Sequence, residues 1–367
     1  MKIMDTDDPM GKKTLFLSAD WGTSSLRIRL VDAATGQVIS EDRSGMGIRQ
    51  CFLSWRETKD TDPGKRISFY LDIIRGALRN MEESLDLPLQ GIPLVLSGMA
   101  SSSAGMLELP YREIPFDIYH EDLITEWLPA GAGPGAGVLL ISGLKSGDDV
   151  MRGEETQLIG CLSGPGGFAA EAAPDHIMAP DVNIGDGLYI FPGTHSKHIL
   201  VKDGTIIGFK TFMTGEIFEL LSEKSLLAGS VEKTRDRPGD RDWASFRRGV
   251  LEASGANFLQ VAFHTRVNDL FGLLSKKENF YYLSGLLIGT ELQDLPAKDA
   301  KDIYLCCGNA LKDHYEKALE LMNVCERVHI FPAELVDLAA VQGQWAVLSR
   351  TKTHNNADGQ AFFKGKI

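Results

Sequence analysis

The sequence has few cysteines, and they follow no pattern. Five cysteines in 367 residues form neither a CxxC pair nor a regular framework, so zinc-ribbon and secreted disulfide scaffolds lack support. Long apolar runs are also missing, because stretches such as Gly137–Leu144 fall well short of the roughly 20 residues that span a bilayer. The first ten residues carry Asp5, Asp7 and Asp8 where a signal peptide would be basic and then apolar. We therefore expect a cytoplasmic protein with no membrane partner.

Positive charge is scarce as well. The chain has 38 Lys and Arg against 50 Asp and Glu, which gives a formal net charge of −12. This balance is opposite to the basic surface that binds nucleic acid, so we expect no nucleic-acid partner. Hydrophobic residues make up 43% and charged residues 24%, which is typical of a soluble globular protein. The length favours two or three domains.

Two parts of the chain repeat one pattern of strand, Gly-Thr loop, strand, turn and strand. In the first, the apolar run 15–19 ends in Asp20–Ser25 and is followed by the alternating residues 26–30. In the second, 188–191 leads into Pro192–Lys197 and then into 198–201. Aligning the first glycine of each loop also aligns the threonines that follow. We interpret the chain as a duplication.

The patterns around each hairpin predict an α/β protein with duplicated mixed sheets flanked by helices. Further strands are expected at 94–96, 138–142, 303–306 and 328–331. Helices are expected at 67–81, 216–227, 246–274 (one or two helices), 279–295, 311–322 and 335–348. We expect an N-terminal extension (1–13), domain I (14–162), a Gly- and Pro-rich linker (163–186), domain II (187–332), a C-terminal helix packed at the interface (333–349) and a tail (350–367).

The paired Gly-Thr loops are candidates for binding an anion. Glycine lets the backbone approach closely, and threonine adds a hydroxyl donor to the backbone N–H groups. Two such loops, Asp20–Ser25 and Pro192–Lys197, could hold the phosphates of a nucleotide from both sides of a common cleft, while Asp20 holds hydrated Mg²⁺. The alternative interpretation is two ordinary hairpin turns.

A second candidate is Met151–Gly160, in which Glu154 and Glu155 stand in the first turn of a short helix. Acidic residues there favour the helix dipole, and this alone could explain them. The functional alternative is that one glutamate is a general base for a hydroxyl, held near Arg152.

A third candidate is Ile303–Leu311, which reads as a strand, a small-residue turn and a helix. Gly308 has no side chain and could let a flat base lie against the backbone. Turns of this kind are common, so a plain connection is the alternative.

With these pieces in order, the chain resembles sugar kinases of the superfamily that joins actin, heat-shock chaperone ATPases and hexokinase. Residues 16–32 and 189–201 are similar to its two phosphate motifs, and 305–311 to its adenosine motif. Within the superfamily, 150–160, 192–197, 213–216 and 283–289 are similar to the 2-dehydro-3-deoxygalactonokinase family. The resemblance implies a two-domain actin-like ATPase (ribonuclease H-like) fold with the active site in the interdomain cleft. It also implies ATP-dependent phosphorylation of the 6-hydroxyl of 2-dehydro-3-deoxy-D-galactonate in galactonate breakdown.

The resemblance further implies roles for individual residues. Asp20 would position Mg²⁺ through water, and Glu154 is our first choice for the base, with Glu155 as the alternative. ATP would be bound by Asp20, Gly22, Thr23, Ser24, Gly193, Thr194, His195, Lys197, Gly308 and Asn309. The sugar acid would be bound by Ser97, Gly98, Met99, Arg152, Thr214 and Glu216. A kinase for another sugar or sugar acid, a phosphoanhydride hydrolase and a non-catalytic regulator are the rival interpretations, and homo-oligomerisation is left open.

Overall fold

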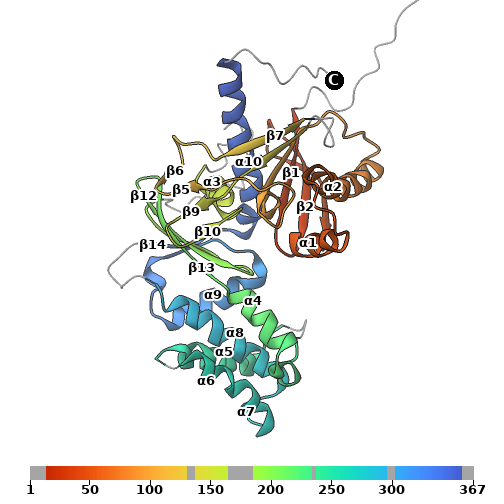
Figure 1. Cartoon of the computed structure of the whole chain (residues 1–367). Coiled ribbons are helices and arrows are strands. Elements are labelled where there is room, and N and C mark those ends of the chain that lie inside the picture. The colour runs from red at the N-terminus through yellow and green to blue at the C-terminus, as the bar shows by residue number, and fades with distance from the viewer. Residues whose placement is uncertain are drawn as a thin grey trace, which may run out of the picture. The chain divides into compact units, whose positions relative to one another are not determined.

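The computed structural model describes residues 14–129, 137–163, 185–233, 237–255, 257–295 and 302–357 (Figure 1). The predicted N-terminal extension, nearly all of the predicted linker and the last ten residues of the predicted tail lie outside these ranges. The chain divides into two compact units. Unit 1 takes Met1–Pro180 and Glu334–Ile367, and unit 2 takes Asp181–Ala333.

The main sheet of unit 1 is mixed. Its strand order is β3-β2-β1-β4-β8-β7, with β1 antiparallel to β2 and parallel to β4. The strands are β1 (Leu15–Trp21), β2 (Leu26–Asp32), β3 (Val38–Ser44), β4 (Leu94–Gly98), β7 (Thr125–Pro129) and β8 (Gly137–Ile141). The short strands β5 (Arg112–Glu113), β9 (Leu144–Lys145) and β10 (Val150–Met151) form a small sheet, and β6 (Phe116–Asp117) follows β5.

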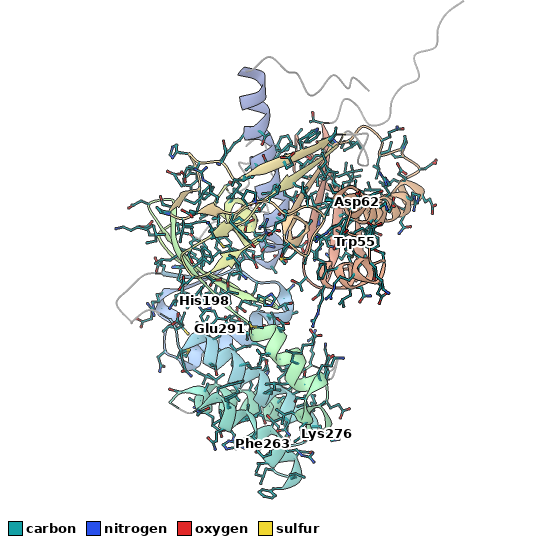
Figure 2. The ribbon with its side chains drawn as sticks, viewed as in Figure 1. Trp55, Asp62, His198, Phe263, Lys276 and Glu291 are labelled. Atoms are coloured by element: carbon teal, nitrogen blue, oxygen red, sulfur yellow. The ribbon has the colours of Figure 1, made fainter. Side chains whose placement is uncertain are left out.

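Two helices cover one face of this sheet, α1 (Ile48–Glu57) and α2 (Pro63–Leu85). Their buried side chains, among them Tyr70 and Ile74, share a core with Trp21 of β1. Helix α2 extends beyond the predicted range 67–81 at both ends, because its limits are set by polar residues. Asp62 accepts a hydrogen bond from the Lys65 N–H and Pro63 follows it, which is a favourable helix start. Figure 2 labels Asp62 at this end of the helix.

Helices α3 (Glu154–Ser163) and α10 (Ala333–Ala357) complete unit 1. They touch through backbone, since a Cβ on Gly160 would lie 1.9 Å from the Ala339 carbonyl and one on Gly343 would lie 1.8 Å from the Thr156 carbonyl. Near its start, α10 carries an aspartate, Asp337, that pairs with Arg27 and Arg29 of β2.

Helix α10 corrects the predicted tail, because it continues through 350–357. No glycine or proline interrupts residues 344–357. Arg350 also donates hydrogen bonds to the carbonyls of Ile118 and Glu121.

Unit 2 repeats the topology of unit 1. Its strands run in the order β15-β14-β11-β12-β13, and β11 is antiparallel to β12 and parallel to β14, as β1 is to β2 and β4. The strands are β11 (Gly187–Phe191), β12 (Ser196–Lys202), β13 (Thr205–Phe212), β14 (Asp302–Leu305) and β15 (Val328–Ile330). The predicted α/β class with duplicated mixed sheets is confirmed.

The helices of unit 2 follow β13 and flank its sheet (Figure 1). They are α4 (Thr214–Glu219), α5 (Asp240–Ala253), α6 (Phe258–Ala262), α7 (His264–Leu270), α8 (Lys276–Leu292) and α9 (Asn309–Leu321), with a π-helical turn at Leu220–Lys224 and 3₁₀ turns at Leu226–Ser230 and Cys325–Arg327. Ile190, Ile288 and Tyr315 belong to one core, which joins α8 and α9 to the sheet. No helix among the described residues is long and apolar enough to cross a membrane.

Two predicted helices of unit 2 are divided. The range 216–227 is interrupted because Ser225 turns the chain and its hydroxyl accepts from the Leu227 N–H. The range 246–274 holds three helices. Gly255 adopts a positive φ of 79°, and Asn257 then caps α6 by accepting from the Leu259 N–H.

Candidate functional site

The first Gly-Thr loop is closed and supported by backbone hydrogen bonds. The Gly22 N–H donates to the Ser25 carbonyl at 2.9 Å, which closes the turn between β1 and β2. The beginning of α1 packs on the loop, where the Ile48 N–H donates to the Gly22 carbonyl at 3.0 Å and the Arg49 N–H donates to the Thr23 carbonyl at 3.1 Å. The loop therefore has a fixed backbone, with Thr23 half-buried and Ser24 exposed.

Gly47 makes this support possible. A Cβ at this position would lie 2.3 Å from the Thr23 carbonyl oxygen, closer than real Cβ atoms come. Only glycine lets the N-terminus of α1 approach the loop this closely. Gly47 was not predicted from the sequence, although its place after the third strand of the repeat was a signal that could have identified it.

Asp20 stands at the end of β1, next to the first loop. Register places it opposite Arg27 of β2 and Ser97 of β4. Burial is the largest influence and raises its pKa, Arg27 opposes this, and the negative charge of Glu154 raises it further. Two carboxylates that disfavour each other's charge suit a divalent cation, since Mg²⁺ binds in proteins through one or two carboxylates together with water and phosphate oxygens.

The end of β4 approaches the same aspartate. Gly98 has a positive φ of 87°, and a Cβ there would lie 2.7 Å from the Trp21 carbonyl and 3.2 Å from a carboxylate oxygen of Asp20. The Ser97 hydroxyl is buried and accepts from Gln344 Nε2 at 2.8 Å, while Met99 is half-buried in the 3₁₀ turn Met99–Ser101. Unit 1 thus brings Ser97, Gly98 and Met99 to Asp20, and their contact with a sugar acid stays a prediction.

The two glutamates at the start of α3 differ in environment. Glu155 is fully buried and accepts the Gly153 N–H on both carboxylate oxygens, at 2.9 and 2.8 Å. Burial, followed by the charge of Glu154, raises the pKa of Glu155 to about 7. Glu154 is half-buried, and one of its oxygens accepts from the Arg152 N–H at 3.2 Å. Glu155 is therefore bonded within the fold, whereas Glu154 is the glutamate that is accessible beside Asp20.

Arg152 is buried, and its side chain serves the fold of unit 1. Its guanidinium donates to the Ser101 hydroxyl at 2.7 Å and to the Leu109 carbonyl at 3.0 Å, and lies 4.0 Å from the centre of the Tyr111 ring. The Nε–H group has no partner among the described residues. Two of its guanidinium nitrogens thus already donate within the fold, and its contact with the sugar acid stays a prediction.

The second Gly-Thr loop is supported by side chains. The Ser196 hydroxyl accepts from the Gly193 N–H at 3.3 Å. His195 Nε2 lies 2.6 Å from a carboxylate oxygen of Glu216. Lys197 is buried and donates to the His195 carbonyl at 3.3 Å. His195 and Lys197 therefore help to hold the loop in shape.

The start of α4 packs on this second loop as α1 packs on the first. The Glu216 N–H donates to the Thr194 carbonyl at 3.0 Å, and a Cβ on Gly215 would lie 2.6 Å from the Gly193 carbonyl oxygen. The Thr214 hydroxyl donates to the buried carboxylate of Glu291. Thr214 and Glu216, predicted to bind the sugar acid, thus contact the second Gly-Thr loop and its support within unit 2.

Gly308 and Asn309 lie where β14 passes into α9. Gly308 is the N-cap residue, both residues are exposed, and a Cβ on Gly308 would meet no atom within 4 Å. A Cβ on Gly193 also meets open space. The open faces of these two glycines fit the predicted approach of phosphate and base.

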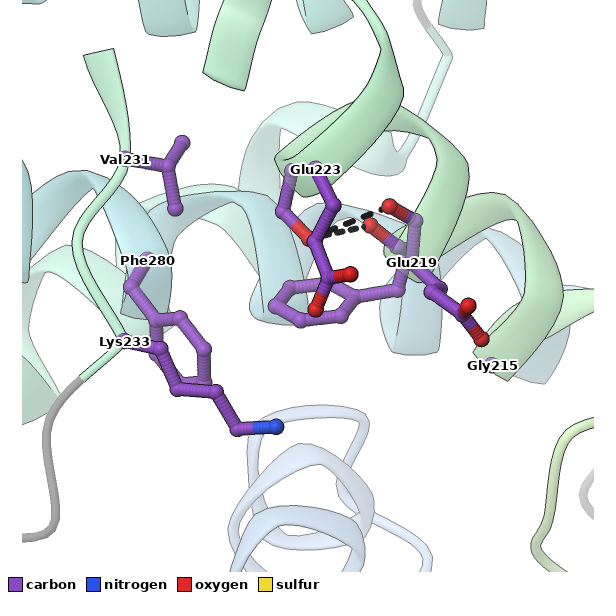
Figure 3. A pocket seen from close by; sticks show the side chains of 8 residues that line it. Gly215, Glu219, Glu223, Val231, Lys233 and Phe280 are labelled. Carbon is purple, nitrogen blue, oxygen red and sulfur yellow. Dashed lines mark hydrogen bonds between the residues drawn. The ribbon is translucent and has the colours of Figure 1, made fainter. Parts of the chain in front are cut away.

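Unit 2 also has a cavity that begins beside the second loop. It has a volume of about 320 Å³, and Gly215 stands at its edge (Figure 3). Two phenylalanine rings, Phe218 and Phe280, pack edge to face in its wall. The remaining lining residues are polar or aliphatic: Glu219, Ser222, Glu223, Val231 and Lys233. Aromatic side chains with a few polar groups are typical of pockets that bind small molecules, so this cavity is a candidate site for the nucleoside.

Comparisons with known proteins agree on one family. A family model described as 2-keto-3-deoxy-galactonokinase matches residues 20–347. The 2-dehydro-3-deoxygalactonokinase of Escherichia coli (strain K12) is 32% identical over 238 residues, which are 63% of this chain and 71% of that protein. A protein of Rhizobium meliloti (strain 1021), provisionally assigned the same activity, is 28% identical over 283 residues, 76% of this chain and 79% of that protein.

The solved structures include a similar fold. The crystal structure of a Sinorhizobium meliloti protein, also provisionally assigned as a 2-dehydro-3-deoxygalactonokinase, has a TM-score of 0.69 and 26% identity, and the match covers 91% of this chain and 96% of that chain. The predicted actin-like ATPase fold is confirmed. The predicted position of the active site between the two domains stays a prediction.

Proposed function

Because the chain belongs to the 2-keto-3-deoxy-galactonokinase family, we propose that it transfers the γ-phosphate of ATP to the 6-hydroxyl of 2-dehydro-3-deoxy-D-galactonate. The observation that carries this proposal is that the half-buried Glu154 is near enough for its charge to raise the pKa of Asp20, which stands at the end of β1 just before the first Gly-Thr loop. A carboxylate in that position can take a proton from a hydroxyl while the loop binds the phosphoryl group.

Glu154 is the general base in this proposal. It accepts the proton of the acceptor hydroxyl as the new oxygen–phosphorus bond forms and the bond to the ADP oxygen breaks. Glu155 is a poor candidate because both of its oxygens already accept the Gly153 N–H and it has no exposed surface. We assign Glu155 to holding the first turn of α3 in place.

The two Gly-Thr loops bind the phosphates. Backbone N–H groups and the hydroxyls of Thr23 and Thr194 donate to phosphate oxygens. Mg²⁺, when bound, neutralises charge on these oxygens, and Asp20 is the residue that would hold it through water. The nucleoside occupies the cavity beside Gly215 and approaches the open face of Gly308.

Ser97, Gly98, Met99 and Arg152 are our candidates for the acceptor side. Arg152 acts there mainly by fixing the segment that carries Ser101 and Tyr111, and its Nε–H, unpartnered within the described part of the chain, is the group that we expect to donate to a ligand. For Thr214 and Glu216 we favour a supporting role under the second loop. We expect the protein to act in the cytoplasm.

The test compares two neighbouring glutamates of equal size. Glu154→Gln should lower kcat by about 10²–10⁴-fold, because glutamine cannot take the proton, while the KM of the sugar acid changes little. Glu155→Gln is the matched control and should lower kcat far less. Phosphorylation is measured as ADP release with and without a panel of 2-keto-3-deoxy acids and plain sugars.

The choice of base and two of the rival functions predict different results in this assay. If Glu155→Gln is the inactive variant, the base is Glu155. Phosphorylation of a different member of the panel would identify a kinase for another acceptor. ADP release that needs no acceptor would identify a phosphoanhydride hydrolase.

A further inference from the structure

A carboxylate that the proposed mechanism does not use lies beneath the second Gly-Thr loop. Glu291 of α8 is 2% exposed. Its Oε2 accepts from the Tyr315 hydroxyl at 2.8 Å and from the Thr214 hydroxyl, and its Oε1 lies 3.0 Å from His198 Nε2. Figure 2 labels His198 and Glu291 side by side in unit 2. Three donors from three different elements thus meet on one buried carboxylate.

These contacts have a defined direction. A carboxylate can only accept, so the hydrogens of Tyr315, Thr214 and His198 Nε2 all point at Glu291. The Tyr315 oxygen lies 3.1 Å from Ser196 Oγ, and because Tyr315 has spent its only hydrogen, Ser196 must donate to it. The Ser196 oxygen is then the acceptor for the Gly193 N–H. The chain of donors runs from the first residue of the loop to Glu291.

The proton of Tyr315 is stable in this arrangement. Burial raises the pKa of Tyr315 well above its ordinary value, and the charge of Glu291 raises it further. The direction of the chain therefore stays the same throughout the neutral range.

The second support of the loop ends on the same carboxylate. Thr214 donates to Glu291. The next two residues touch the loop: Gly215 is in close contact with Gly193, and the Glu216 N–H donates to the Thr194 carbonyl. Glu291 is therefore the junction of both supports. An apolar side chain would fill this space at lower cost in free energy, because burying a charge seldom stabilises a fold.

We propose that Glu291 and Tyr315 are positioning residues that fix the orientation of the Gly193–Ser196 loop for phosphoryl transfer. They act through Ser196 and Thr214 and touch no substrate. This inference rests on the proposed kinase activity. It predicts that removing one buried hydroxyl changes catalysis and not only stability.

The decisive variant is Tyr315→Phe, which removes that hydroxyl and keeps the ring. A matched control exists in the same unit. Tyr282 is also fully buried and donates to a carboxylate, Glu252 Oε2, at 2.6 Å. Its hydroxyl also lies 3.2 Å from the Val261 carbonyl, and neither partner belongs to the second Gly-Thr loop. Both variants should lower Tm by similar amounts. Tyr315→Phe should lower kcat by about 10–100-fold, because small misplacements of reacting groups are costly, while Tyr282→Phe stays within about twofold of the wild type.

A second variant tests whether the chain acts as a unit. Ser196→Ala breaks it one step closer to the loop and should lower kcat about as much as Tyr315→Phe. The double variant should be no worse than the more damaged single variant, because groups that act in series are not additive. Equal kcat for Tyr315→Phe and Tyr282→Phe, or full additivity of the two chain variants, would overturn the inference.

Failure of the proposed function gives a different result. In that case the wild type shows no acceptor-dependent ADP release at all, and the same variants are compared by calorimetric titration with MgATP. Weaker binding by Tyr315→Phe than by Tyr282→Phe supports a positioning role in nucleotide binding, and equal binding overturns it.

Discussion

The two Gly-Thr loops have the same position in their sheets but are held by different chemistry. In each, a glycine at the start of the next helix, Gly47 or Gly215, presses on the loop backbone. The first loop receives two backbone hydrogen bonds from α1. The second receives one from α4, and its other supports are side-chain contacts, including those that converge on Glu291. A duplicated scaffold thus keeps the geometry of its loops while the groups that hold them diverge.

This difference determines how each loop can be altered. Backbone support is insensitive to most side-chain substitutions, so the first loop depends on one glycine. Side-chain support can be removed atom by atom, so the second loop has several sites at which a mutation would act. The loops also differ in charge, because Asp20 in the first repeat aligns with Phe191 in the second.

Among changes that separate the two loops, the largest effect is expected from Asp20, the carboxylate that only the first repeat has. Asp20→Ala should lower kcat by about 10²–10³-fold, the range for losing one group that stabilises the transition state. Folding should not suffer, because burial raises the pKa of Asp20, which means that the fold disfavours its charge. Steady-state kinetics together with thermal unfolding at neutral pH check both parts. Unchanged kinetics would show that the first loop binds no metal-phosphate group.

The next effect concerns the buried acid beside the first loop. The pKa of Glu155 is raised from its ordinary value of 4.5 to about 7, so between these values the folded state keeps a proton that the unfolded state has released. Raising the pH through this window should lower the free energy of unfolding, by up to about 3 kcal/mol, and the loss should be complete above the folded pKa. In Glu155→Gln, the free energy of unfolding measured by chemical denaturation should decline less between pH 5 and 8 than in the wild type. If the wild type had the same free energy of unfolding at pH 5 and at pH 8, the raised pKa of Glu155 would be contradicted.

The smallest effect is expected from substitutions of Gly47 and Gly215, the two glycines that contact the loops. Gly47→Ala and Gly215→Ala should each destabilise their unit by about 1–3 kcal/mol, the usual cost of forcing an extra methyl group into a packed site. Gly47→Ala should cost more, because its Cβ would lie 2.3 Å from backbone and that of Gly215 would lie 2.6 Å away. Gly45→Ala is the control, since a Cβ there meets nothing within 4 Å. Equal denaturation midpoints for Gly45→Ala and Gly47→Ala would show that the loop backbone shifts to accommodate the added methyl group at little cost in stability.

The hairpins could be predicted because their information is local. Alternating residues define β1, β2, β11 and β12, and the Gly-Thr pair marks each turn, so one short window suffices. The position of Glu154 at the start of α3 is local for the same reason. The different roles of Glu154 and Glu155 could not be predicted locally, because the burial of Glu155 and its hydrogen bonds with Gly153 depend on how α3 packs.

The support of the second loop could not be predicted from the sequence. Ser196, Glu291 and Tyr315 are far apart in the chain, and each residue type is common. Their significance arises only when α8 and α9 pack beneath β12 and bring three polar groups into one apolar environment. Thr214 and Glu216 were noticed through the resemblance, but their contacts depend on the same packing.

Helix α10 carries a consequence for the order in which the protein is made. It supplies Asp337 to the arginines of β2 and Gly343 to the backbone of α3, yet it follows all of unit 2 in the chain. On the ribosome, unit 2 is continuous and can fold as soon as it emerges, whereas the arginines of β2 lack their partner until the segment after unit 2 has been translated. Unit 1, whose strands are translated before unit 2, is therefore completed after it. A chain that ended before residue 334 would contain all of unit 2, but its unit 1 would lack the contacts that α10 makes with β2 and α3.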